Sequence, residues 1–189
     1  MIIGLTGESG AGKDTAAEYL KGRGFSYHSL SDILREECQK ISQETNRDNL
    51  IAMGNRLRAE FGPSILAKKI LEKISATGGS ASGGKDNHEE NSLVVSIRNP
   101  AEVVELKKEL SFKLISVVAP LEIRYQRISG RGRPEDRVSL EKFKEQEERE
   151  MAGSENEQQL RKVMAMADYT VSNGGTVKEL EEQINNYVH

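Results

Sequence analysis

The chain contains one cysteine, Cys38, among its 189 residues. A single cysteine cannot close an internal disulfide bond or supply a multi-cysteine zinc site, and this suits a protein of the reducing cytosol. We expect Cys38 to be a small, partly buried apolar side chain.

Long apolar runs and an excess of basic charge are also missing. No stretch approaches the ~18 apolar residues of a membrane span, and the apolar residues 1–3 are too few for a signal sequence. A net charge of -3 and a pI near 5.8 differ from those of a general nucleic-acid-binding protein. We therefore expect a cytoplasmic monomer or homodimer without membrane or nucleic-acid partners. Its length fits a single domain, residues 1–189.

What the chain does contain is a glycine-rich segment, residues 7–15, between an apolar run and a helix-forming stretch. Its sequence, GESGAGKDT, fits the G-x-x-x-x-G-K pattern of a P-loop, whose backbone N–H groups surround phosphate oxygens while the lysine reaches the β- and γ-phosphates. The following helix N-terminus adds partial positive charge. Asp14 stands where a Ser or Thr hydroxyl normally meets Mg²⁺. We expect this loop to bind ATP through Gly7, Ser9, Gly10, Ala11, Gly12, Lys13, Asp14 and Thr15.

Apolar runs predict strands at residues 2–6, 25–29, 93–97, 114–118 and 169–172. Because helical patterns separate them, we expect an α/β fold, with a parallel sheet covered on both faces. Two helix starts are defined by their sequence. Asn99, Pro100 and Glu102 supply an N-cap, a first-position proline and a first-turn acid, and Thr176 with Glu179 forms a capping box.

A long helical insert, residues 31–76, lies between the second and third strands. Apolar residues at 50, 53, 54, 57 and 61 follow helical spacing, and a second helix is expected near 65–74. The insert carries Arg47, Arg56 and Arg58. Residues 77–91 have no apolar side chains beyond alanine, and they predict a flexible surface loop with a solvated His88.

The densest basic group lies at residues 124–138. Arg124 and Arg127 share a helix face, and Arg131 and Arg133 follow in a loop broken by Gly and Pro. Guanidinium groups stabilise the charge of a transferring phosphoryl group, so this segment predicts a mobile lid over the ATP phosphates. The alternative is a solvated basic loop paired with the acidic helix 141–150, which we interpret as a charged amphipathic surface.

Two more groups follow predicted strands, at the edge where ligands bind in open α/β sheets. Asp32 is expected to orient or deprotonate an acceptor hydroxyl or to hold Mg²⁺ through water, and Arg35 to hold an anionic acceptor. The alternative for Asp32 is a first-turn acid behind a Ser31 cap. Arg98 is expected to grip a second phosphate, whereas Asn99 caps a helix.

The third predicted strand contains no acid, so the usual Walker B aspartate is missing there. Asp14 or Asp32 is expected to take over the Mg²⁺ contact. After the last strand, the backbone of Asn173, Gly174 and Gly175 either lets a flat base approach closely or forms only a turn.

Together these residues resemble the nucleoside monophosphate kinase and dephospho-CoA kinase branch of the P-loop kinases, over essentially the whole chain. Residues 29–35 are similar to the start of the acceptor-binding helix of adenylate kinases, and residues 167–176 to the last strand and base-contacting loop of dephospho-CoA kinases. Residues 12–15 resemble deoxynucleoside monophosphate kinases and phosphomevalonate kinases. The chain also resembles the kinase-like region fused to some deoxycytidylate deaminases, but its one cysteine cannot supply that enzyme's zinc ligands.

The resemblance implies a P-loop three-layer fold with a five-stranded parallel sheet, a helical acceptor-binding insert and an arginine-rich lid. Our leading hypothesis is Mg²⁺- and ATP-dependent phosphoryl transfer to a small phosphorylated acceptor, such as a nucleoside or deoxynucleoside monophosphate. The catalytic residues expected are Lys13, Asp32, Arg127, Arg131 and Arg133, and the acceptor-binding residues are Asp32, Arg35, Arg56 and Arg98. Arg127 is also expected to contact ATP.

Two alternatives stay open. One is a dephospho-CoA kinase, although Ser31-Asp32 stands where that family has paired aspartates. The other is a nucleotide-binding regulatory module without transfer activity. The chain lacks the Asn/Thr-Lys-x-Asp tetrapeptide of GTPase switches, which favours a kinase.

Overall fold

The computed structural model describes residues 1–77, 91–131 and 138–188. In these parts of the chain five parallel strands form one sheet, in the order β2-β3-β1-β4-β5. The strands are β1 (Ile2–Gly7), β2 (Ser26–Ser29), β3 (Ser92–Val95), β4 (Phe112–Val118) and β5 (Tyr169–Ser172). All five strands predicted from apolar runs are therefore confirmed, and so is the parallel α/β fold.

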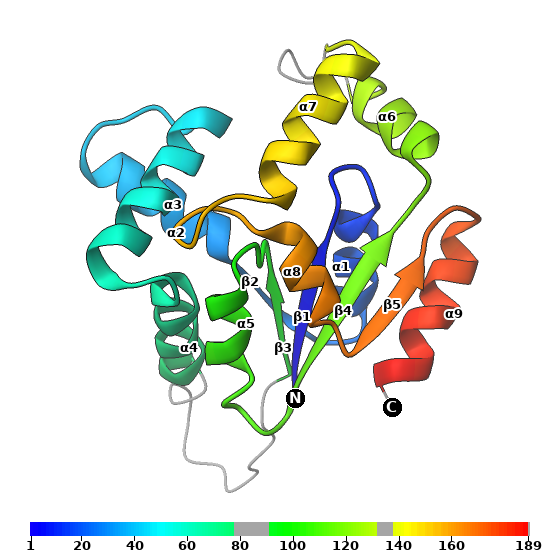
Figure 1. Cartoon of the computed structure of the whole chain (residues 1–189). Coiled ribbons are helices and arrows are strands. Elements are labelled where there is room, and N and C mark those ends of the chain that lie inside the picture. Colours follow the sequence, from blue (N-terminus) through cyan, green and yellow to red (C-terminus); the bar gives the residue numbers. More distant parts are fainter. Residues whose placement is uncertain (78–90, 132–137, 189) are drawn as a thin grey trace, which may run out of the picture.

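Helices cover both faces of the sheet (Figure 1). They are α1 (Lys13–Gly22), α2 (Leu30–Lys40), α3 (Arg47–Phe61), α4 (Ile65–Thr77), α5 (Pro100–Leu106), α6 (Leu121–Ser129), α7 (Leu140–Met151), α8 (Leu160–Ala165) and α9 (Val177–Val188). Side chains alternate along β1, so that Ile2 packs into one core and Ile3 and Leu5 into the other. The first core lies under α2 to α5 and α8, and the second under α1 and α9.

The strand order places the P-loop at the middle of the sheet. β1 lies between β3 and β4, and the chain leaves its carboxyl end to begin α1 (Figure 1). β2 leads into the helical insert, α2 to α4, on one side, and β4 leads into α6 on the other. This edge beside β1, where the connections diverge, is the usual ligand site of open α/β sheets.

Local sequence signals set several helix starts as expected. Asn99 and Glu102 form a capping box at α5, with Pro100 at its start, and Thr176 and Glu179 exchange backbone-to-side-chain hydrogen bonds before α9. The cap of α2 was predicted wrongly. Ser29, not Ser31, is its N-cap, and its hydroxyl accepts a hydrogen bond from the Ser31 backbone N–H.

Several predictions fall outside the described residues. They concern the loop at 78–90, including His88, and the lid segment at 132–137, including Arg133. Cys38 is completely buried rather than partly buried. Within the described ranges, no helix has the length and apolar character needed to cross a bilayer.

Candidate functional site

The P-loop has a backbone shape that few residues other than glycine allow. Gly7 has φ +132° and Gly12 has φ +97°. A Cβ on Gly12 would lie 1.9 Å from Nδ2 of Asn173, so the loop backbone and that side chain are packed too closely for any larger residue. No side chain caps the first turn of α1. The N–H groups there suit an anion.

Lys13 lies over the loop that precedes it. Its Nζ donates hydrogen bonds to the carbonyl oxygens of Gly7 and Glu8, both at 2.7 Å. Burial, and then the positive charge of Arg98, lower the pKa of Lys13 to about 7. Lys13 is therefore an electrostatic neighbour of Arg98, although 85 positions separate them in the sequence.

The loop after β5 is fastened to the P-loop. Asn173 is 4% exposed, and its Nδ2 donates to the carbonyl oxygen of Ala11 at 2.8 Å. Gly174 and Gly175 are exposed beside it, next to Pro120 and Glu179. In the loop predicted to contact a base, Asn173 therefore holds the P-loop in place, whereas Gly174 and Gly175 are exposed.

Arg124, at the start of the predicted lid, is buried and fixed in place. Its Nε donates to the carbonyl oxygen of Ala119 at 2.9 Å, and its Nη1 donates to that of Ser9 at 3.3 Å. The guanidinium also pairs with Glu8 at 3.3 Å and with Glu147 of α7. Arg124 therefore joins α6, the P-loop and α7, and takes no part in a moving lid.

The other lid arginines have different surroundings. Arg127 has a buried Nη1 with no hydrogen-bond partner among the described residues, and this atom would lie 3.7 Å from a Cβ on Gly12. Arg131 pairs with Asp14 at 3.5 Å. Arg127 therefore keeps a donor beside the P-loop, which suits a phosphate oxygen.

A cavity of about 80 Å³ lies beside the carboxyl end of β3. Leu34, Leu50 and Ile51 supply an apolar part of its lining. Its polar lining comes from α2, α3, the end of β3 and α7, through Ser31, Arg47, Arg58, Ser96, Arg98 and Glu150. The cavity is therefore lined by arginines, one glutamate and apolar side chains.

Two of these cations share one carboxylate. Arg98 donates from Nη1 to Oε2 of Glu150 at 2.7 Å and to Oε1 of Gln158 at 3.0 Å. Arg47 donates to the other oxygen, Oε1, of Glu150. Glu150 itself is 7% exposed. The expectation that helix 141–150 is only a charged surface was therefore wrong, because Glu147 and Glu150 are turned inward to arginines.

Sequence reasoning missed Glu150, although a weak signal was present. Phe143 is buried and Met151 is half-buried, and these two mark the inner face of α7. Glu147 and Glu150 lie four and seven residues after Phe143, which puts them on that same face. Their charge concealed the pattern.

Arg58, rather than Arg56, reaches the cavity from α3. Arg47, Gly54 and Arg58 lie on one helix face and line the cavity, whereas Arg56 is exposed on another face. Arg58 is also half of a buried ion pair, in which its Nη2 lies 2.9 Å from Oε1 of Glu102. The structure therefore brings Arg98 of the predicted acceptor group to this cavity, and adds Arg47 and Arg58.

The acids predicted to hold Mg²⁺ lie outside the cavity. Asp32 and Arg35 form an exposed pair at 2.6 Å on the first turns of α2. Burial raises the pKa of the Tyr27 phenol, and the negative charges of Asp32 and Asp14 raise it further. Within the described residues, no group of three or more metal-binding side chains occurs.

Ser96 has a strained backbone at the end of β3. Its φ of +65° is rare for a residue with a side chain. Its hydroxyl lies 3.4 Å from that of Ser29, and the carbonyl oxygen of the next residue, Ile97, accepts from the Thr6 hydroxyl at 3.0 Å. This turn leads directly to Arg98. Strained residues concentrate at functional sites.

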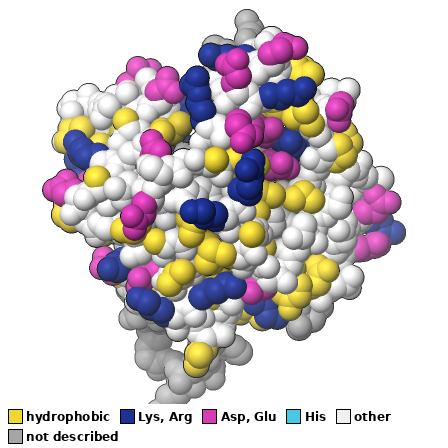
Figure 2. Space-filling view, viewed as in Figure 1, with side chains coloured by type: hydrophobic (Ala, Val, Ile, Leu, Met, Phe, Trp, Pro, Cys, Tyr) yellow, Lys and Arg dark blue, Asp and Glu magenta, His cyan; other side chains and the backbone are white. Residues whose placement is uncertain are grey.

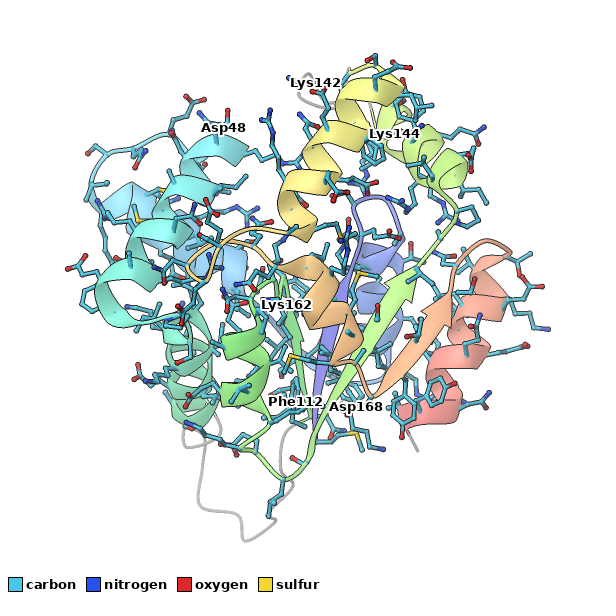
Figure 3. The ribbon with its side chains drawn as sticks, viewed as in Figure 1. Asp48, Phe112, Lys142, Lys144, Lys162 and Asp168 are labelled. Carbon is cyan, nitrogen blue, oxygen red and sulfur yellow. The ribbon has the colours of Figure 1, made fainter. Side chains whose placement is uncertain are left out.

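The cavity continues outward into an open cleft of about 560 Å³ between α3 and α7. Asp48 and Lys142 lie on its opposite walls (Figure 3). Charged side chains of both signs gather over α7 on this face (Figure 2). Arg47 and Glu150 line both the cavity and the cleft, so their ion pair lies where the two meet. Asn55 also lines the cleft, and its buried Oδ1 has no partner in the described part of the chain.

Comparison with solved structures identifies the fold. The crystal structure of TT1252 from Thermus thermophilus matches the whole chain and 95% of its own, with TM-score 0.62 and 21% identity. The match to dephospho-CoA kinase from Campylobacter jejuni covers 99% of this chain and 94% of that protein, with TM-score 0.54 and 18% identity. The match to shikimate kinase from Aquifex aeolicus covers 100% of this chain and 96% of that protein, with TM-score 0.51 and 15% identity. The fold is that of the P-loop kinases.

Comparison of sequences gives the family. The family model described as an AAA domain matches residues 3–153. A UPF0200 protein from Sulfurisphaera tokodaii is 32% identical over 96% of this chain and 92% of its own length. A UPF0200/UPF0201 protein from Archaeoglobus fulgidus is 33% identical over 97% of this chain, which spans 53% of that protein. The chain therefore belongs to the AAA domain family and is a UPF0200 protein.

Proposed function

We propose that the protein is an ATP-dependent phosphotransferase that moves the γ-phosphoryl group to a small phosphorylated acceptor, a nucleoside or deoxynucleoside monophosphate. The observation that carries this proposal is the position of the arginine-lined cavity. Arg98, in its lining, follows β3, and the P-loop follows β1, the strand paired with β3. The Thr6 hydroxyl at the end of β1 donates to the carbonyl oxygen of Ile97, next to Arg98, at 3.0 Å. A donor site and an anion-binding acceptor site are thus adjacent, as phosphoryl transfer requires.

On the donor side, Lys13 and the P-loop N–H groups hold the β- and γ-phosphates. Arg127 supplies its unpartnered Nη1 to the charge that develops on the transferring group, and Arg131 adds a second cation near Lys13. Asp14 and Thr15 begin α1 and fit the role of Mg²⁺ ligands, because Mg²⁺ takes few protein carboxylates when it also binds phosphates. Held by Asp14 and Thr15, Mg²⁺ would neutralise part of the charge of the phosphates.

On the acceptor side, the cavity favours an acceptor that is already ionised. Among the described residues of its lining, Glu150 is the only acid. Burial raises the pKa of Glu150, but the charges of Arg98 and Arg47 outweigh burial and hold the pKa below its usual value. Such a carboxylate is a weak base. A phosphate oxygen needs no base, whereas a hydroxyl acceptor does.

Asp32 would then help to position the acceptor and would not act as a general base. It lies outside the cavity lining and pairs with Arg35 at the exposed start of α2. We infer that the Asp32–Arg35 pair contacts the outer part of the acceptor. Asp32→Asn should therefore lower turnover on a phosphate acceptor less than tenfold, a loss of under about 1.4 kcal/mol.

The test is an ATP-consumption and product assay over nucleoside monophosphates, deoxynucleoside monophosphates, dephospho-CoA and shikimate. Lys13→Ala should abolish transfer to any active acceptor. Lys21→Ala, which removes an exposed lysine from the same helix, should leave it unchanged.

The two hydroxyl acceptors in that panel test the alternatives suggested by the fold. Product from dephospho-CoA or shikimate alone would replace the monophosphate acceptor with a hydroxyl acceptor. ATP binding with no product from any acceptor would support a regulatory nucleotide-binding module instead.

A further inference from the structure

Glu150 occupies an unusual position for a structural ion pair. Its two oxygens are divided between two cations from different parts of the fold, Arg47 at the start of α3 and Arg98 after β3. A carboxylate that accepts from two arginines in this way has the arrangement that a bound phosphate or carboxylate would have. Glu150 therefore fills the anion-binding part of the cavity from within.

A second buried pair in the same region serves as a comparison. Arg58 and Glu102 are 4% and 0% exposed, and Glu102 also accepts from the backbone N–H groups of Arg98 and Asn99. That pair fixes the fold. In contrast, Arg47 and Arg98 keep side-chain exposures of 40% and 28%, and Arg47 and Glu150 line the outer cleft as well. A ligand entering through the cleft can reach these cations.

Glu150 is also well placed to leave. It is the second-last residue of α7, where the helix ends and an irregular segment toward α8 begins. The open cleft lies directly outside it and is lined by its neighbour Arg149. A small movement of this helix end would release the carboxylate into the cleft.

We propose that Glu150 is an internal stand-in for the anionic group of the acceptor, and that the acceptor displaces it from Arg47 and Arg98. The proposal rests on the proposed function, because it identifies this cavity as the acceptor site. Glu150 then determines how tightly the site holds any acceptor, since each must compete with it. In the free protein Glu150 also keeps Arg47 and Arg98 paired.

One substitution separates this role from a structural one, because the two roles predict opposite changes in anion affinity. If Glu150 only positions the arginines for the acceptor, Glu150→Gln weakens anion binding. If Glu150 competes with the acceptor, the same change strengthens binding, because glutamine keeps the shape but not the charge. We expect inorganic phosphate to bind Glu150→Gln at least ~10-fold more tightly than the original protein, which corresponds to about 1.4 kcal/mol.

The experiment is calorimetric titration with inorganic phosphate. The P-loop is first saturated with Mg²⁺ and a non-hydrolysable ATP analogue, so that added phosphate cannot occupy the γ-position. Glu148→Gln is the matched control, because Glu148 lies on the same helix in an exposed pair with Arg161. It should leave the affinity for phosphate unchanged. Arg98→Gln should abolish the binding.

A second Glu150 variant keeps the test decisive if Glu150→Gln does not fold. Glu150→Asp keeps the charge but shortens the reach by one methylene, so it cannot bridge both arginines, and it should show an intermediate gain. Unchanged or weaker phosphate binding in a folded Glu150 variant overturns the proposal, and so does the absence of phosphate binding in all of these proteins.

This test does not depend on catalysis. Tighter phosphate binding without product from any acceptor would contradict the proposed function, but it would still show that Glu150 competes with an anion for Arg47 and Arg98. Product formation together with weaker phosphate binding in Glu150→Gln would support the proposed function and contradict the role of Glu150.

Discussion

The side-chain amide of Asn173 donates a hydrogen bond to the carbonyl oxygen of Ala11 at 2.8 Å, and so connects the loop after β5 to the P-loop. Both groups are buried. Because the loop proposed to hold the phosphates depends on a residue 162 positions away, its shape requires the folded sheet.

Asn173→Asp should therefore weaken ATP binding at least ~10-fold. The change replaces a donor by a carboxylate that faces a carbonyl oxygen, and a buried unpaired polar group costs about 1–3 kcal/mol. Equilibrium titration with ATP and a thermal melt measure the two effects. Asn186→Asp, at an exposed position of α9, should change neither.

Arg127→Gln should lower kcat by about 10²–10³ with little effect on the KM for ATP. Its buried Nη1 has no partner in the described part of the chain, so its interaction is reserved for a ligand, and loss of one such donor has a cost of this size. Steady-state kinetics checks this. Arg161→Gln, at a 66% exposed side chain, is the control. Equal losses in both variants would contradict the assignment.

ATP binding should be accompanied by proton uptake at pH 8. The pKa of Lys13 is about 7 because of burial and the charge of Arg98, so the free protein carries this lysine mostly neutral at pH 8. A bound triphosphate favours the charged form and raises the pKa. We expect uptake of ~0.9 proton at pH 8 and ~0.1 at pH 6, from the fraction protonated at each pH.

Calorimetry of Mg²⁺–ATP binding in two buffers of different ionisation enthalpy measures this uptake. Lys13→Met should bind ATP weakly and take up no proton. Proton release at pH 8 would show that the lysine is not recharged by the ligand.

Arg58→Met should destabilise the fold by about 3–5 kcal/mol, because it leaves Glu102 as an uncompensated buried charge. The double variant Arg58→Met/Glu102→Gln should recover part of this loss. Glutamine is neutral and still offers an oxygen to the backbone N–H groups of Arg98 and Asn99. Denaturant unfolding of both variants tests the prediction. Lys21→Met, which breaks an exposed pair, should cost less than ~1 kcal/mol.

Asn55→Leu should affect stability and activity in opposite directions. The Oδ1 of Asn55 is buried in the wall of the outer cleft without a partner among the described residues, so its removal relieves a cost of about 1 kcal/mol. The same atom suits an N–H or O–H donor of the acceptor. We expect a higher melting temperature and a raised acceptor KM, with an unchanged KM for ATP. A fall in both stability and affinity would make Asn55 a structural residue.

Much of the fold, including the turn of the P-loop, could be predicted because the signals are local. The glycine spacing of the P-loop, the apolar runs of the strands and the caps at Asn99 and Thr176 each depend on a few consecutive residues. The cavity proposed to bind the acceptor could be predicted only in part. Arg98 follows a strand end and was identified, whereas the choice of Arg58 over Arg56 depends on how α3 is rotated against its neighbours.

Glu150 was missed for a related reason. Five glutamates occur in residues 141–150, and sequence alone does not tell which of them turn inward. Their placement depends on arginines at positions 47, 98 and 124, which only the folded chain brings near. Ion pairs between distant segments leave no periodic pattern in the sequence.

Helix α7 has a consequence for how the two proposed substrates affect each other's binding. Glu147 and Glu150 are three residues apart on its inner face, and they pair with Arg124 beside the P-loop and with Arg98 in the cavity. One short helix thus contacts a residue beside the P-loop and a residue of the proposed acceptor site. We expect ATP and the acceptor to bind with synergy, each changing the affinity of the other by the same factor, so that the proposed reaction proceeds through a ternary complex and not through two independent sites.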